Sequence, residues 1–303
     1  MEKNAGDLKK STVKKNTEKN ILRGTLIPPR MKRELLIASG VDPSGAAGLA
    51  VDIATAHDFN VDPAIFVTAF TIQSGRSIHR VEPREASHAK AELKYLLGEF
   101  RPRIMKIGMI PDENTVKIVS SSLQIVPRIT KIVDPILCSS SGKALISTKG
   151  FNALLSTLLP GAILTPNLVE AEIISRQKIL SDKDREAAAQ RILNMGAFAV
   201  IIKGGHDSTD RADDLLASRN DFIWIRGKAR RSANGRRVQL RGTGCRFSTA
   251  FACSLIHGLD LEKSARLAKR FVRDALTKSD LESQVLPHFI QRHGRQAPGR
   301  RRK

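Results

Sequence analysis

Short apolar runs alternate with longer helical segments along most of this chain, and this alternation constrains the fold more than any other feature. The apolar runs read as buried strands at 34–39, 64–70, 104–109, 131–137, 162–167 and 199–205. Segments with helical spacing lie between most of them, at 86–98, 112–123, 150–158, 169–175 and 184–195. Continuous apolar strands separated by helices are typical of a mostly parallel sheet that is covered on both faces. The sequence therefore predicts an α/β fold with three layers, α/β/α.

The alternating region is bounded by two basic tails. Residues 1–33 are polar, rich in lysine and without periodicity, which predicts a disordered segment. The end of the chain, 277–303, is predicted to be a second, largely disordered tail. One domain over 34–276 is the economical interpretation of what remains. Its last part is predicted to hold a hairpin near 213–226, followed by two helices, the first at 245–257.

The net charge of +21 is spread unevenly. About +6 lies in residues 1–34 and about +5 in 277–303, and most of the remainder lies in 226–241, which has seven basic residues and no acid. Such charge attracts polyanions, either nucleotide phosphates or RNA, although solvated tails and a solvated loop are the simpler interpretation. Aromatic residues make up only 4% and do not interleave with the basic runs, so we expect no specific nucleic-acid binding.

Cysteine usage and hydropathy exclude several classes of protein. The three cysteines, Cys138, Cys245 and Cys253, form no C-x-x-C pair, which excludes a disulfide framework and a zinc-binding spacing. No apolar run reaches the roughly 18–20 residues that a membrane span needs, and residues 1–20 lack the apolar region of a secretory signal. We therefore expect a cytoplasmic protein that does not bind membranes.

Polar residues or glycines follow almost every predicted strand. They lie at 40–45, 73–75, 108–109, 134–135, 166–170 and 203–206. Any one of these stretches is ordinary loop punctuation. Because the carboxyl ends of parallel strands meet at one edge of a sheet, where ligands bind in such folds, the six together predict a functional site.

The stretch RGTGCRFSTAF, residues 241–251, has the properties of an anion-binding loop. Gly242 and Gly244 let the backbone approach a ligand closely, and successive N–H groups at the start of the following helix form an anion cradle. Cys245 lies in the first helical turn, where the helix dipole favours a thiolate. The amides could then hold a transferred phosphoryl group while the thiolate takes a proton from an attacking hydroxyl. The alternative is a plain helix start with a buried cysteine.

Seven motifs occur in an order that resembles the hydroxymethylpyrimidine/phosphomethylpyrimidine kinases of thiamin biosynthesis, in the ribokinase superfamily. They are SGVDPSGAAG (39–48), TIQSG (71–75), KIGM (106–109), DPI (134–136), TPNLVEAE (165–172), KGGH (203–206) and GTGC (242–245). The resemblance covers about residues 34–276. It implies a ribokinase-like fold and ATP-dependent, Mg²⁺-assisted phosphorylation of 4-amino-5-hydroxymethyl-2-methylpyrimidine and its monophosphate. It also implies a homodimer.

The resemblance implies a role for each matching residue. The residues of the phosphoryl-transfer loop are the base Cys245 and the anion hole Gly242, Thr243 and Gly244. The residues implied to contact the pyrimidine are Gly40, Asp42, Gln73 and Met109. The residues implied to hold the nucleotide are Asn167, Lys203 and Thr243, and those implied to hold magnesium are Asp134 and Glu170.

Simpler roles compete with several of these. Asp42 could cap a helix that starts near 44–48, Asp134 could fix a strand end before proline, and Lys203 could be a solvated loop charge. His206 is interpreted as a loop donor. The cysteines outside the loop, Cys138 and Cys253, are interpreted as packing residues.

The sequence departs from the family pattern beside the cysteine loop. Arg241 replaces the usual His before it, and Arg246 replaces the usual small residue after the Cys. Arg241 could clamp the phosphate of a monophosphate substrate. Arg246 would favour the Cys245 thiolate if its side chain points inward. The alternative is that the side chain points to solvent. Two alternative functions therefore stay open: a pyridoxal- or pyridoxine-type kinase, and a noncatalytic pyrimidine-binding sensor.

Overall fold

In the part of the chain that the structure describes, nine strands form one sheet in the order β3-β2-β1-β4-β5-β6-β7-β8-β9. The computed structural model describes residues 33–73, 77–139, 142–205, 210–219, 221–232 and 234–293, with side chains described as far as residue 279. The parallel strands are β1 (Leu35–Val41), β2 (Ala64–Gln73), β4 (Ile104–Ile107), β5 (Thr130–Val133), β6 (Ile163–Leu164) and β7 (Ala199–Ile202). The antiparallel strands are β3 (Ile78–Pro83), β8 (Asp214–Ser218) and β9 (Phe222–Ile225).

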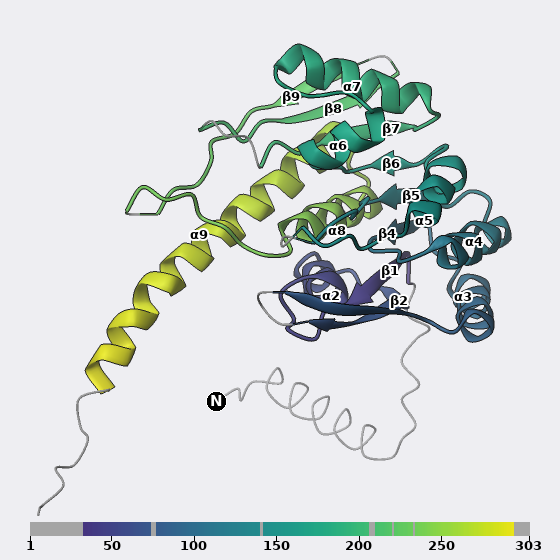
Figure 1. Cartoon of the computed structure of the whole chain (residues 1–303), viewed down its shortest axis with the longest axis horizontal. Helices are drawn as coiled ribbons and strands as arrows, with labels where there is room; N and C mark the ends of the chain where they lie inside the picture. The colour runs from purple at the N-terminus through teal and green to yellow at the C-terminus, as the bar shows by residue number, and fades with distance from the viewer. Residues whose placement is uncertain are drawn as a thin grey trace, which may run out of the picture. The chain divides into compact units, whose positions relative to one another are not determined.

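Helices cover both faces of this sheet, as Figure 1 shows. One face carries α3 (Ala86–Phe100), α4 (Glu113–Ser122), α5 (Thr148–Ala153), α6 (Leu168–Ser175) and α7 (Asp182–Asn194). The other face carries α2 (Gly48–Asp58), α8 (Thr243–Ile256) and the first part of α9 (Leu261–His293). Short helical turns at Leu123–Ile125 and Leu154–Leu158 extend α4 and α5. The predicted three-layer α/β/α fold is confirmed.

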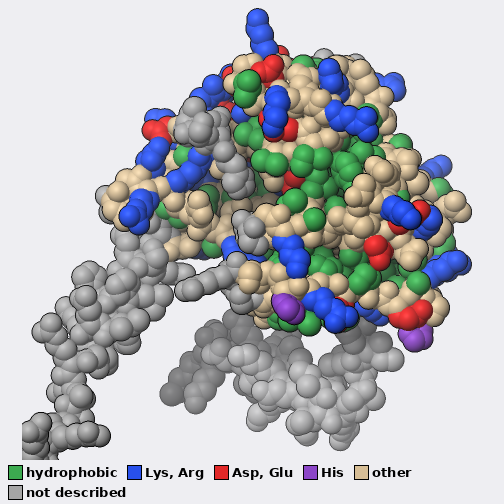
Figure 2. Space-filling view, viewed as in Figure 1, with side chains coloured by type: hydrophobic (Ala, Val, Ile, Leu, Met, Phe, Trp, Pro, Cys, Tyr) green, Lys and Arg blue, Asp and Glu red, His purple; other side chains and the backbone are tan. Residues whose placement is uncertain are grey.

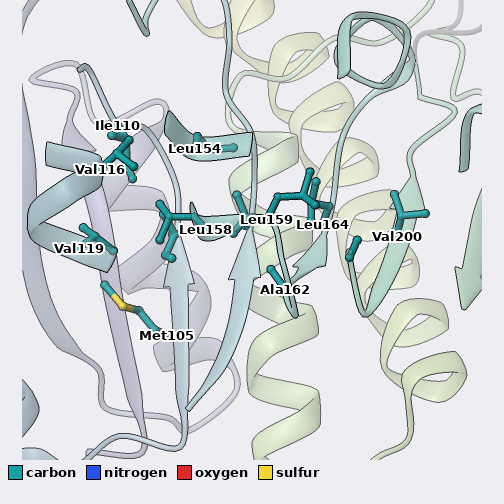
Figure 3. Packing of buried hydrophobic residues seen from close by; sticks show 14 of the residues in the cluster. Met105, Ile110, Val116, Val119, Leu154, Leu158, Leu159, Ala162, Leu164 and Val200 are labelled. Carbon is teal, nitrogen blue, oxygen red and sulfur yellow. The ribbon is translucent and has the colours of Figure 1, made fainter. Parts of the chain in front are cut away.

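The two larger hydrophobic cores of the described residues form because successive strand residues point to opposite faces of the sheet. Leu36 and Ala38 of β1 belong to the core under α3–α7, whereas Leu35 and Ile37 belong to the core under α2, α8 and α9. Figure 3 shows part of the first core, where Met105 of β4 lies near Val119 of α4. Strands that are apolar on both faces are what a sheet covered on both sides requires.

All six predicted parallel strands are present, but several end earlier than expected. The run at 131–137 forms a strand only to Val133: the Asp134 N–H still donates to the Ile107 carbonyl oxygen at 2.8 Å, but Pro135 has no N–H with which to continue the ladder. The edge strand β3 was not predicted, since its sequence IHRVEP is mostly polar and its side chains are exposed or half-buried. An edge strand that pairs on one side only does not need apolar residues on both faces.

The end of the domain differs from the prediction. The hairpin near 213–226 is confirmed as β8 and β9. The C-terminal tail predicted from residue 277 is instead helical as far as His293, because α9 runs on without a break. Its first turns are held by an ion pair between Glu262 and Arg266, four residues apart. Residues 1–32 of the predicted N-terminal tail lie outside the described residues, whereas Arg33 belongs to the folded domain, where it donates to the Pro63 carbonyl oxygen at 3.1 Å.

Across the helices that the structure describes, none combines the length and the apolar character needed to cross a membrane. The longest of them, α9, carries charged residues throughout its length.

Candidate active site

The predicted site residues converge on the carboxyl edge of the parallel strands. Asp42 follows β1, Gln73 ends β2, Asp134 follows β5 and Lys203 follows β7. The N-terminus of α8 lies among them, since Lys203 Nζ and the Asp134 carboxylate are within 4 Å of where a side chain on Gly244 would begin. The topology of the sheet therefore brings together side chains that lie as far apart in the sequence as residues 42 and 245.

The start of α8 is open to a ligand. Its N-cap residue, Gly242, has a left-handed conformation with φ +75°, and no side chain of the described residues caps the helix. A Cβ at this position would lie 2.6 Å from the Ala46 carbonyl oxygen, so glycine is needed for the loop to pack here. Uncapped N–H groups at a helix N-terminus, together with the helix dipole, favour an anion.

Gly48 joins the loop after β1 to the cysteine. It has φ +61°, and a Cβ there would overlap the Gly40 carbonyl oxygen. With glycine in place, the Gly48 N–H donates a hydrogen bond to the Cys245 sulfur. The last glycine of SGVDPSGAAG thus positions the thiol, a role that the sequence analysis did not assign.

The surroundings of Cys245 oppose the thiolate that the helix dipole is expected to favour. The side chain is only 5% exposed, and burial raises the pKa of the Cys245 thiol to about 12. The carboxylates of Asp52 and Asp134 raise it further, while Lys106 and the Gly48 N–H oppose them. The loss of hydration is the largest of these effects, so the thiol is neutral at pH 7.

A buried ion pair beneath the cysteine was missed by the sequence analysis. Lys106 Nζ donates to both oxygens of Asp52 at 2.9 and 2.8 Å, and both side chains are 0% exposed. Thr249 of α8 donates to the same carboxylate at 2.8 Å. The pair holds the pKa of Lys106 above its usual value despite its burial. A lysine within the otherwise apolar run IMKIGM was the signal available.

Asp134 and Lys203 form a second charged pair at the mouth of the α8 loop. Lys203 Nζ donates to Asp134 Oδ1 at 2.9 Å, and Thr165 and Ser248 also donate to this carboxylate. Burial opposes the charged form of Asp134, but Lys203 and Lys106 hold its pKa below the usual value. Lys203 is only 13% exposed, so the interpretation of this residue as a solvated loop charge was wrong.

Asn167 and Glu170 form a capping box at the start of α6. Glu170 N–H donates to Asn167 Oδ1 at 2.9 Å, and Asn167 N–H donates to Glu170 Oε2 at 2.8 Å. The Leu137 N–H also donates to the Glu170 carboxylate. Burial and the nearby Asp134 carboxylate raise the pKa of Glu170 to about 7, although Lys203 opposes this. Glu170 therefore holds its proton until close to neutral pH.

The donors near Asp134 fit magnesium only in combination with a phosphate ligand. Mg²⁺ is usually held by one or two carboxylates together with substrate phosphates and water. Asp134 and Glu170 would offer two hard oxygen ligands, and no cluster of three or more His, Cys, Asp or Glu able to hold a metal occurs in the described part of the chain. The donor set matches an ion that arrives with a nucleotide.

The implied pyrimidine contacts lie in or just after β1, β2 and β4. Asp42 Oδ1 accepts from the Ser44 N–H at 2.9 Å and from its hydroxyl at 2.7 Å, which stabilises the turn after β1. Asp42 does not cap α2, whose N-cap residue is Ala47. Met109 packs against Gly40, where a Cβ would lie 2.9 Å from the Met109 sulfur.

Arg241 reaches into this group of acceptors. Its Nη2 lies 3.2 Å from Asp42 Oδ2 and 3.5 Å from Gln73 Oε1, and its Nη1 lies 3.4 Å from Ser44 Oγ. Arg246 donates instead to the Arg241 carbonyl oxygen at 3.0 Å, so it braces the loop and does not pair with the thiol.

The basic segment 226–241 runs from β9 to the α8 loop. It folds back on itself through a bridge between Arg231 and Arg237, and Arg231 forms an ion pair with Asp210. Lys and Arg side chains gather over this segment in Figure 2. The segment therefore brings positive charge to the edge of the sheet where the predicted site lies.

Other predicted residues lie outside the site. Cys253 is buried in α8 as expected, whereas Cys138 is exposed, so its interpretation as a packing residue was wrong. His206 lies outside the described residues. A cavity of about 550 Å³ opens at the opposite edge of the sheet, beside Arg103 and Phe198. No residue of the seven motifs lines this cavity, so it is separate from the candidate site.

Comparison with known proteins agrees with this geometry. The family model described as phosphomethylpyrimidine kinase matches residues 42–287. A hydroxymethylpyrimidine/phosphomethylpyrimidine kinase of Aquifex aeolicus is 33% identical over 245 residues, which cover 80% of this chain and 94% of the relative.

Solved structures give the same result. The crystal structure of phosphomethylpyrimidine kinase from Clostridium difficile 630 matches with a TM-score of 0.69 and 28% identity, over 80% of this chain and 98% of the other. The pyridoxal kinase of Staphylococcus aureus, in complex with AMP-PCP and pyridoxal, matches with a TM-score of 0.69 and 28% identity, over 80% and 87%. This chain belongs to the phosphomethylpyrimidine kinase family, and it is a phosphotransferase.

Proposed function

We propose that this protein uses ATP to phosphorylate 4-amino-5-hydroxymethyl-2-methylpyrimidine and then its monophosphate, giving the pyrimidine diphosphate for thiamin synthesis. The observation that carries the proposal is the position of the uncapped N-terminus of α8. It lies between the Lys203–Asp134 pair on one side and the group of Asp42, Gln73 and Arg241 on the other. A phosphoryl group held there would have the nucleotide on the side of Lys203 and Asp134 and the acceptor on the side of Asp42, Gln73 and Arg241.

The nucleotide side consists of the α8 loop and Lys203. The N–H groups of Gly242, Thr243 and Gly244 bind the transferred phosphoryl group, and Lys203 and Asn167 hold the nucleotide. In the reaction, an acceptor oxygen forms a bond to the γ-phosphorus while the bond from that phosphorus to the β–γ bridging oxygen breaks. The electron pair leaves on ADP, and charge on the phosphoryl oxygens is balanced by the amides and by Lys203.

Magnesium fits this side through Asp134 and Glu170. When bound with the nucleotide, the ion neutralises charge on the phosphates. Asp134 is already ionised in this geometry, whereas Glu170 must first lose its proton, which its pKa of about 7 allows near neutral pH.

The acceptor side consists of Gly40, Asp42, Gln73 and Met109. The Gln73 amide can both donate to and accept from a ring nitrogen and its amino group, which suits an aminopyrimidine. Met109, packed against Gly40, supplies an apolar surface for the ring. Asp42 offers a carboxylate oxygen at the end of β1.

Cys245 serves as the base for the hydroxyl substrate. The hydroxyl proton passes to the Cys245 sulfur as the new bond to phosphorus forms, which requires that the thiol has first ionised. Because the pKa of the Cys245 thiol is about 12, the thiolate is scarce at pH 7, although the positive charge of Lys106 beneath the sulfur favours it. Alcohol phosphorylation should therefore accelerate as pH rises.

Two cysteines of α8 provide a matched test. We expect Cys245→Ala to lower ADP release with the hydroxymethyl substrate by about 100-fold or more, the usual contribution of general-base catalysis. Cys253→Ala removes another buried thiol from the same helix and should leave the rate within about threefold. Equal rates in the two variants would contradict the role of Cys245.

A pyridoxal kinase is the second candidate, favoured by the likeness to the Staphylococcus aureus enzyme bound to AMP-PCP and pyridoxal. Both acceptors carry a hydroxymethyl group on an aromatic nitrogen-containing ring, so the same loop can transfer a phosphoryl group to either one. ADP release with pyridoxal but with neither pyrimidine would establish this candidate. The homodimer implied by the resemblance stays a prediction, which light scattering of the protein in solution tests.

A further inference from the structure

Arg241 occupies the acceptor side of the site in the described structure. Its guanidinium group bridges Asp42, Gln73 and Ser44 at 3.2 to 3.5 Å, and these are long hydrogen bonds for a charged donor. The Asp42 side chain is 3% exposed and that of Arg241 is 29% exposed. The carboxylate is thus buried beneath an arginine that is still reached by solvent.

From this geometry we infer that Arg241 selects the phosphomonoester over the neutral alcohol as acceptor. The inference rests on the proposed function and specifies its substrate class. A neutral hydroxymethyl group offers the guanidinium only a weak hydrogen-bond partner. A phosphate offers the same guanidinium two anionic oxygens in a matching fork.

The charges of the reaction point the same way. When a phosphomonoester attacks ATP, two anionic phosphates approach each other, and each needs a cation beside it. Lys203 lies beside the α8 loop, 3.3 Å from where a side chain on Gly244 would begin. Arg241 directly precedes this loop and supplies the second cation on the acceptor side. Arg246 fixes its backbone through the hydrogen bond to the Arg241 carbonyl oxygen.

The proton requirement also separates the two acceptors. A phosphomonoester loses its second proton near pH 6, so at pH 7.5 its oxygen attacks without a base. A hydroxyl group needs the Cys245 thiolate, which burial makes scarce. The site is therefore better suited to the second phosphorylation than to the first.

The test compares kcat/KM for the monophosphate and the alcohol in the full chain at pH 7.5. In Arg241→Gln we expect the value for the monophosphate to fall by about 10- to 100-fold, as for the loss of a charged hydrogen-bond partner. The value for the alcohol should change by less than about threefold. The control, Arg236→Gln, removes the same charge from an exposed position of the same basic segment and should leave both values unchanged.

Each outcome decides a different claim. Equal losses for both substrates in Arg241→Gln would overturn the selection by Arg241 while leaving the kinase function intact. A wild-type protein that phosphorylates and binds neither pyrimidine, measured by calorimetry, would overturn the proposed function itself. If Arg241→Gln does not fold, Arg241→His replaces it. Its preference for the monophosphate should fall between pH 6 and pH 8.5, relative to wild type, as the imidazole loses its charge. A preference that stays parallel to wild type would overturn the inference.

Discussion

The buried pair of Lys106 and Asp52 allows a stability prediction that can be worked from the structure. Lys106→Met keeps the length of the side chain but leaves Asp52, at 0% exposure, with only the Thr249 hydroxyl as a side-chain partner among the described residues. Removing one partner of a buried ion pair costs about 3–5 kcal/mol, because a charge stays buried without its counterion. That is a large part of the roughly 5–15 kcal/mol that stabilises a typical protein.

Urea unfolding followed by the fluorescence of Trp224, the single tryptophan, measures this cost. An exposed pair serves as the control, since Lys117 Nζ lies 2.6 Å from Glu113 but the side chains are 65% and 37% exposed. Lys117→Met should cost less than about 0.5 kcal/mol. The double variant Lys106→Met/Asp52→Leu should recover most of the loss, because no buried charge remains. A cost for Lys106→Met similar to that for Lys117→Met would refute the reasoning.

Four further predictions follow from the site. In the wild type, folding raises the pKa of Glu170 from 4.5 to about 7, so wild-type stability should fall as pH rises between these values. Glu170→Gln keeps the capping box but removes this carboxyl group. The variant should gain up to about 3 kcal/mol above pH 7 and nothing below pH 4.5, by urea unfolding. Turnover of the alcohol should rise nearly tenfold per pH unit between pH 7 and 9 as Cys245 ionises, and a flat profile would contradict its role as base. Gly48→Ala should destabilise the protein by more than Gly45→Ala, since both have positive φ but only the first meets a backbone oxygen; equal melting temperatures would refute this. Lys203→Met should raise the KM for ATP at least tenfold, and an unchanged KM would place the nucleotide elsewhere.

The sequence predicted the layers and the location of the candidate site because both follow from sequence patterns that can be read without knowing which residues are in contact. Apolar runs separated by helices specify a parallel sheet, and a parallel sheet gathers its loops at one edge. The capping box of Asn167 and Glu170 is likewise readable from spacing. These features are local, or they follow from topology alone.

What the sequence did not predict depends on burial and on contacts between distant segments. Burial is the largest cause of the raised pKa of Cys245, and the depth of burial is known only once α8 packs on the loop after β1. The partner of Lys106 lies 54 residues away in the sequence, on α2. The length of α9 was underestimated because residues 277–303 were read from their charge and not from helical spacing.

The most direct test of the account is the identity of the product that the wild-type protein makes. The pyrimidine monophosphate and pyridoxal are supplied together with ATP and Mg²⁺, and ³¹P NMR follows the phosphorus signals. The account predicts the coupled pair of signals of the pyrimidine diphosphate, appearing at the rate at which ADP forms. Formation of pyridoxal phosphate alone, or no product besides ADP from slow hydrolysis, would contradict it.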